Sequence, residues 1–152
     1  MNDNDLVSVV IPTYRRSEML PRAINSVLNQ TYEDIEIIVV DDNNPNTKYR
    51  EATKKIMEHY KDNSKIKYIK HDVNKNGSAA RNTGIKYSSG KYVCFLDDDN
   101  YFYPCKIEKQ LEFLTSNPEY KAVYCGWRND NKEYIPYRSG NLMYEQFIGN
   151  NI

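Results

Sequence analysis

Short apolar runs alternate along this chain with segments whose apolar residues recur every three or four positions. Residues 6–11 are almost continuously apolar and are followed by Pro12, a pattern typical of a strand buried on both faces of a parallel sheet. Ser17 then offers an N-cap for a helix with Pro21 in its first turn. The apolar face predicted for this helix is formed by Leu20, Ile24, Val27 and Leu28.

The same alternation continues to about Trp127. We predict four further strands, at residues 35–40, 66–69, 92–96 and 122–124. Three further helices are predicted between these strands. The first has Tyr49, Ala52, Ile56 and Tyr60 on its apolar face, and the second spans 79–87 and closes near Gly90. The third spans 106–115, with Ile107, Leu111 and Leu114 on its apolar face. This βαβ series predicts an α/β fold, with a mostly parallel, Rossmann-like sheet flanked by helices on both faces.

The segment after Trp127 has a weaker pattern. We expect a polar loop at 128–132, a short strand at 134–137 and a short helix at 142–148. The 152 residues are enough for one ordinary domain, so we expect a single domain over 1–152.

Composition and charge argue against several classes of function. Basic and acidic residues number 21 each, so no global positive field favours nucleic acid. The apolar runs are too short to cross a bilayer, and the acidic start of the chain does not resemble a signal peptide, which together favour a cytoplasmic protein. The three cysteines lack the spacing of a zinc site and favour neither metal nor disulfide.

Candidate chemistry follows the predicted strands directly. In an open parallel sheet, ligands bind beyond the carboxyl ends of the strands, where the topology reverses. The residues found there are Pro12, Thr13, Tyr14 and Arg16 after the first strand, Asp41 and Asp42 after the second, and Asp97, Asp98 and Asp99 after the fourth. Aromatic, basic and acidic groups therefore converge on one edge.

Each of these groups has a plain structural alternative. The triple aspartate suits Mg²⁺ or Mn²⁺, which bind oxygen ligands jointly with substrate phosphates, but it could also be a solvated acidic turn. Asp41 and Asp42 could accept hydrogen bonds from a base or a ribose, or simply form an Asx turn. Tyr14 could stack on a base and Arg16 could reach a phosphate, although exposed loop residues of these types are common.

A run of small residues, 76–84, opens a predicted helix and carries Arg81. Such a helix start lets the backbone approach an anion, or else allows close packing on the sheet. No dinucleotide fingerprint, P-loop or Gly-x-Ser-x-Gly elbow occurs, and His59 and His71 are isolated in the sequence. Oxidoreductase, NTPase and acyl hydrolase functions therefore have little support.

Taken in order, four motifs resemble those of family 2 glycosyltransferases, which have the GT-A fold. The resemblance extends over residues 6–127. Its motifs are VSVVIPTY at 7–14, IVVDDN at 38–43, ARNTG at 80–84 and FLDDD at 95–99.

The resemblance implies binding of a nucleotide-sugar donor. It places the nucleobase, most often uracil, on Tyr14 and Asp42, with Pro12 and Thr13 shaping the pocket. Asp97 and Asp99 match the Asp-x-Asp motif and imply a Mn²⁺ or Mg²⁺ site, with Asp97 also near the ribose and Asp98 at the variable position. Arg81 would lie beside the diphosphate.

The family also implies transfer with inversion to a saccharide or lipid-linked acceptor, as in polysaccharide biosynthesis, with peripheral association with a membrane as one option. Its catalytic base is expected downstream of Ile152, since no aspartate follows Asp130. Two alternatives stay open. One is a non-catalytic nucleotide-sugar-binding module, and the other is a metal-dependent nucleotidyltransferase, which the lack of glycine after the first strand disfavours.

Overall fold

The computed structural model describes residues 5–129 and 132–135. The chain divides into two compact units, Met1–Glu112 and Phe113–Ile152, and each is described by itself. No helix in the described part of the chain is long and apolar enough to span a bilayer.

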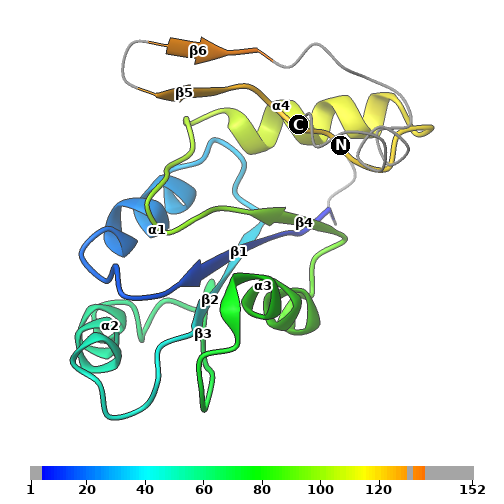
Figure 1. Ribbon diagram of the computed structural model, residues 1–152. Coiled ribbons are helices and arrows are strands. Elements are labelled where there is room, and N and C mark those ends of the chain that lie inside the picture. Colours follow the sequence, from blue (N-terminus) through cyan, green and yellow to red (C-terminus); the bar gives the residue numbers. More distant parts are fainter. Residues whose placement is uncertain (1–4, 130–131, 136–152) are drawn as a thin grey trace, which may run out of the picture. The chain divides into compact units, whose positions relative to one another are not determined.

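The first unit is built on a sheet of four parallel strands, in the spatial order β3-β2-β1-β4 (Figure 1). The central strand β1 pairs with β2 on one side, starting from Val7 opposite Ile35, and with β4 on the other, starting from Val7 opposite Tyr92. The strands are β1 (Val7–Thr13), β2 (Ile35–Asp41), β3 (Ile66–Lys70) and β4 (Tyr92–Phe95). The order reverses between β1 and β4, so a ligand crevice is expected beyond their carboxyl ends.

Helices cover both faces of this sheet, because alternate residues of β1 and β2 bury their side chains in two separate apolar clusters. Val9 and Ile37 lie in the larger cluster with residues of α1, α2 and α4, whereas Val10 and Ile38 pack with Ala80 of α3. The helices are α1 (Leu20–Leu28), α2 (Lys48–Glu58), α3 (Asn76–Tyr87) and α4 (Lys106–Ser116). The predicted α/β fold with helices on both faces is confirmed.

Pro12 lies inside β1 and does not end it. The Leu96 N–H donates to the Val10 carbonyl, so the even-numbered residues of β1 turn their backbone polar groups toward β4. The pairing with β4 stops at Val10, and the missing N–H of Pro12 therefore faces a position where the ladder has already ended. Ser17 is not the cap of α1 either, because Met19 occupies the N-cap position.

The buried face of α2 differs from the predicted one. Ala52 is exposed, and the fully buried residues of this helix are Arg50, Thr53 and Met57. A search for apolar periodicity overlooks Arg50, whose guanidinium reaches backbone carbonyls at the edge of the sheet. Helix α3 begins at Asn76, three residues before the predicted start.

The second unit contains a hairpin. The strand predicted at 122–124 is wrong, because those described residues have no regular structure. Strand β5 (Trp127–Asn129) instead pairs antiparallel with β6 (Lys132–Tyr134), and the Trp127 and Tyr134 rings stack with centroids 3.9 Å apart. The hairpin replaces the loop predicted at 128–132. Of the strand predicted at 134–137, Tyr134 belongs to β6 and Ile135 has no regular structure, and residues 136–137 lie outside the described residues. The helix predicted at 142–148 also lies outside them.

Candidate functional site

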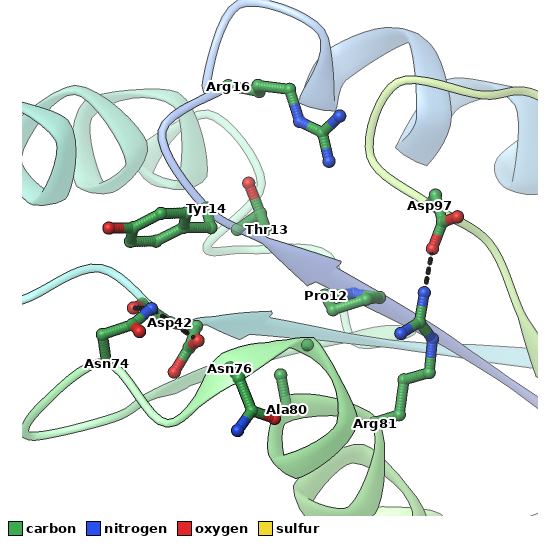
Figure 2. Close-up of a pocket in the computed structure, with 11 residues that line it drawn as sticks. Pro12, Thr13, Tyr14, Arg16, Asp42, Asn74, Asn76, Ala80, Arg81 and Asp97 are labelled. Atoms are coloured by element: carbon green, nitrogen blue, oxygen red, sulfur yellow. Dashed lines mark hydrogen bonds and ion pairs between the residues drawn. The ribbon is translucent and has the colours of Figure 1, made fainter.

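A cavity of about 350 Å³ opens at the carboxyl ends of β1 and β2, beside the start of α3. Figure 2 shows Tyr14 and Asp42 on one side of it, and Asp97 with Arg81 on the other. The structure therefore brings together seven of the predicted site residues. The lining consists of Pro12, Thr13, Tyr14, Arg16, Asp42, Asn74, Asn76, Gly77, Ala80, Arg81 and Asp97.

The three consecutive aspartates have different environments. Asp98, the middle one, is fully buried and accepts a 2.8 Å hydrogen bond from the Thr13 hydroxyl and a longer one from the Tyr14 N–H. Burial raises the pKa of the Asp98 carboxyl, and the hydrogen bond from Thr13 and the charge of Arg16, 2.9 Å away, oppose that rise. Asp98 thus ties the end of β1 to the segment after β4 and lies behind the cavity.

Asp97 and Asp99 are the accessible carboxylates of the triplet. Their side chains are 46% and 35% exposed, and each pairs with an arginine: Asp97 with Arg81 at 2.5 Å, and Asp99 with Arg16. An ion pair as exposed as that of Arg81 and Asp97 is worth little, about 0–1 kcal/mol, so a ligand can replace Arg81 there at small cost.

The two accessible carboxylates fit a hard divalent cation. Among the described residues, no three Asp, Glu, His or Cys side chains are grouped closely enough to hold a metal ion by themselves. Mg²⁺ in proteins is usually bound by one or two carboxylates together with water and substrate phosphates. Asp97 and Asp99 can supply the carboxylates.

Asp42 lines the cavity while its carboxylate is held from behind. Its Oδ1 accepts hydrogen bonds from His71 Nδ1 at 2.7 Å and from the Lys75 N–H at 2.8 Å, and its Oδ2 accepts one from Asn74 Nδ2 at 2.8 Å. Sequence reasoning missed His71 and Asn74. The available signal was position, because both follow β3 at the same edge of the sheet.

Asp41 is not brought to the cavity. Adjacent residues of a strand point to opposite faces, so Asp41 points away from Asp42 and is fully buried. Its carboxylate accepts hydrogen bonds from the Asn43 amide and the Tyr68 hydroxyl, and it lies 3.2 Å from Arg50 Nε. Burial and the bond to Asp41 raise the pKa of Tyr68 strongly.

The turn after β1 sets the direction of Tyr14. Arg15 has a φ of 60°, an uncommon conformation for a residue other than glycine. Its backbone N–H donates to Asn43 Oδ1 at 2.9 Å, and its guanidinium lies 4.8 Å from the centre of the Tyr14 ring and 5.2 Å from that of Tyr49. These contacts hold the turn, with Tyr14 at the rim of the cavity.

The start of α3 supplies the positive end of the site. Asn76, Gly77, Ala80 and Arg81 all belong to its first two turns and line the cavity. Unpaired backbone N–H groups and the helix dipole at such a terminus favour an anion. Arg81 and Arg16 add positive charge beside this helix end, and each contacts one of the accessible aspartates.

Comparison with known proteins identifies the family of this chain. The Glycosyl transferase family 2 model matches residues 8–152. A glycosyltransferase of Rickettsia bellii is 42% identical over 111 residues, which are 73% of this chain and 15% of that protein. The Escherichia coli enzyme WfgD, a UDP-Glc:alpha-D-GlcNAc-diphosphoundecaprenol beta-1,3-glucosyltransferase, is 35% identical over 116 residues, 76% of this chain and 43% of the enzyme.

Among solved structures, TarS 1-349 of S. aureus in complex with UDP-GlcNAc is similar, with a TM-score of 0.65 and 26% identity over 74% of this chain and 32% of TarS. The chain thus spans less than half the length of each of these relatives. The order of the sheet, the cavity at its carboxyl edge and these matches agree. The chain belongs to glycosyltransferase family 2, and its first unit has the GT-A fold.

Proposed function

We propose that this domain binds a uridine diphosphate sugar, together with Mn²⁺ or Mg²⁺, for transfer of the sugar to an acceptor hydroxyl. The observation that carries the proposal is the division of one cavity into two chemically different sides. The Tyr14 ring and the fixed Asp42 carboxylate lie on one side. The other side has two arginines, the start of α3 and Asp97, with Asp99 paired to Arg16 nearby.

The side formed by Tyr14 and Asp42 suits the nucleobase. The Tyr14 ring offers a stacking surface, and the free acceptor position of Asp42 can receive a ring N–H. Pro12 and Thr13 form the wall between them, because the end of β1 runs along the cavity. The complex of TarS with UDP-GlcNAc supports this choice of nucleotide.

The opposite side suits the diphosphate. Arg81 and the first turn of α3 would bind phosphate oxygens, and Asp97 and Asp99 would hold the cation, with Asp98 fixing the segment that carries them. When bound, a divalent cation neutralises the charge that develops on the leaving diphosphate. Arg16 lines the cavity and would contact the phosphates while keeping its ion pair with Asp98.

We further propose that the acceptor is a saccharide or a lipid-linked saccharide, which the activity of WfgD supports. A lipid-linked acceptor would bring the protein to a membrane surface. The carboxylates lining the cavity, Asp42 and Asp97, are both held by hydrogen-bond donors or an arginine. The base that deprotonates the acceptor hydroxyl, in a single displacement with inversion, would then come from outside the described residues.

Isothermal titration calorimetry with UDP, GDP, dTDP and CDP, with and without Mn²⁺, tests the proposal. We expect UDP to bind most tightly among UDP, GDP and CDP, and to require Mn²⁺ for its full affinity. Asp99→Asn should abolish that dependence, and Asp62→Asn, an exposed aspartate in the loop before β3, should leave it unchanged. Equal affinity for UDP with and without Mn²⁺ would refute the proposed metal site.

A further inference from the structure

His71 makes two hydrogen bonds that the proposed donor site does not yet explain. It directly follows β3 and is only 5% exposed. Its Nδ1 lies 2.7 Å from Asp42 Oδ1, and its Nε2 lies 2.8 Å from Thr83 Oγ1. His71 does not line the cavity, but Asp42, to which it is hydrogen-bonded, does.

These two contacts determine which ring nitrogen carries hydrogen. An ionised carboxylate only accepts hydrogen bonds, so Nδ1 must donate to Asp42. In the neutral ring Nε2 is then an acceptor, and the Thr83 hydroxyl donates to it. Thr83 belongs to α3, the helix that also carries Arg81. The chain of bonds from Thr83 through His71 to Asp42 therefore connects both sides of the cavity.

The hydrogen bonds that the Asp42 carboxylate already accepts leave it one free acceptor position on Oδ2. Its Oδ1 already accepts two hydrogen bonds, from His71 and Lys75, whereas its Oδ2 accepts one side-chain bond, from Asn74. All three partners are donors, and a carboxylate oxygen offers about two acceptor positions. What Asp42 presents to the cavity is therefore one fixed acceptor.

We propose that His71 is a positioning residue that holds Asp42 as an acceptor of one orientation, and so selects bases with a ring N–H. This rests on the proposed function. Uracil and thymine carry a hydrogen on N3 and guanine on N1, and each can donate to Asp42. Cytosine N3 and adenine N1 carry lone pairs, which would face a carboxylate oxygen without a hydrogen between them, an arrangement that costs binding energy.

The test compares His71→Phe with His71→Asn. Phenylalanine keeps a planar ring without the N–H, and asparagine keeps an N–H near the position of Nδ1. We expect His71→Phe to weaken UDP binding about tenfold in the presence of Mn²⁺ and to lower the ratio of UDP to CDP affinity by a similar factor. His71→Asn should recover most of both losses, a rescue that a purely space-filling role would not produce.

Two further variants keep the test decisive. Thr83→Val removes the donor to Nε2 at a half-buried, nearly isosteric position, and should lower the UDP to CDP ratio a few-fold even if His71→Phe does not fold. His59→Phe, at an exposed histidine after α2, is the matched control and should change nothing. Thermal unfolding of each variant checks that it is folded.

The outcomes separate the two proposals. If the unchanged protein binds no nucleoside diphosphate with or without Mn²⁺, the proposed function fails. If it binds UDP, and folded His71→Phe and Thr83→Val variants keep its UDP to CDP ratio, the role of His71 is overturned while the donor site stands. If the ratio falls in both variants and asparagine restores it, the role of His71 is supported.

Discussion

The close approach of α3 to β1 gives a quantitative prediction for Gly84. A Cβ atom at this position would lie 2.1 Å from Val10 Cγ1 and 2.8 Å from its Cγ2. Val10 is fully buried, and its strand is hydrogen-bonded to neighbours on both sides, so Val10 has little room to retreat. Gly84→Ala must therefore push the helix away from the sheet by about 1.4 Å to restore an ordinary carbon contact of about 3.5 Å.

The expected cost follows from two opposing effects. Overpacking of a well-packed core costs about 1–3 kcal/mol, and the size of this overlap places Gly84→Ala at the upper end of that range. Alanine is about 1 kcal/mol more favourable than glycine inside a helix, which offsets part of the cost. We expect a net loss of about 2 kcal/mol, or a melting temperature about 4–8 °C lower for a chain of this size.

Urea unfolding followed by circular dichroism measures this loss, and Gly77→Ala on the same helix is the matched control. A Cβ at Gly77 would meet only the flexible end of Arg81, at 3.3 Å, so this variant should be as stable as the parent or up to about 1 kcal/mol more stable. In a Val10→Ala background, the cost of Gly84→Ala should fall by at least about 1 kcal/mol. A Gly84→Ala protein as stable as Gly77→Ala, or a cost unchanged by Val10→Ala, would refute the reasoning.

Three further predictions concern charged groups. Arg50→Met should cost about 3–5 kcal/mol in urea unfolding, because it leaves the Asp41 carboxylate buried without its cation, and adding Asp41→Asn should recover part of that loss. Burial alone would raise the pKa of Glu36. The hydrogen bonds that its carboxylate accepts, first from Lys67, outweigh burial, so the net pKa of Glu36 lies below its ordinary value. Glu36 should therefore add stability above its unfolded-state pKa of about 4.3 that is lost as the pH falls through the lower folded-state pKa, and Glu36→Gln should flatten that part of the pH profile. Arg81→Ala should tighten binding of Mn²⁺ alone about threefold in calorimetry by freeing Asp97 and should weaken UDP binding, and an unchanged Mn²⁺ affinity would contradict the proposed metal site.

The architecture of the first unit can be predicted from the pattern of apolar and polar residues. Residues 7–11 and 35–40 are apolar at nearly every position, as is typical of strands covered on both faces, and the helical spacing between the strands favours parallel crossovers. The convergence of Thr13, Asp42 and Asp97 on one edge then followed from topology, because the carboxyl ends of parallel strands share that edge.

Which of these residues reach the cavity depends instead on long-range contacts in the folded chain. Asp41 and Asp42 are neighbours of the same type, yet the pleat of β2 turns one toward Arg50 and the other toward the cavity. Asp98 differs from Asp97 and Asp99 in the same way, since Thr13, distant in sequence, draws it inward. His71 shows no motif because its role depends on contacts with Asp42, which follows β2, and with Thr83 of α3. Apolar periodicity reports burial, whereas the partner of a buried polar group is set by long-range packing that no local pattern contains.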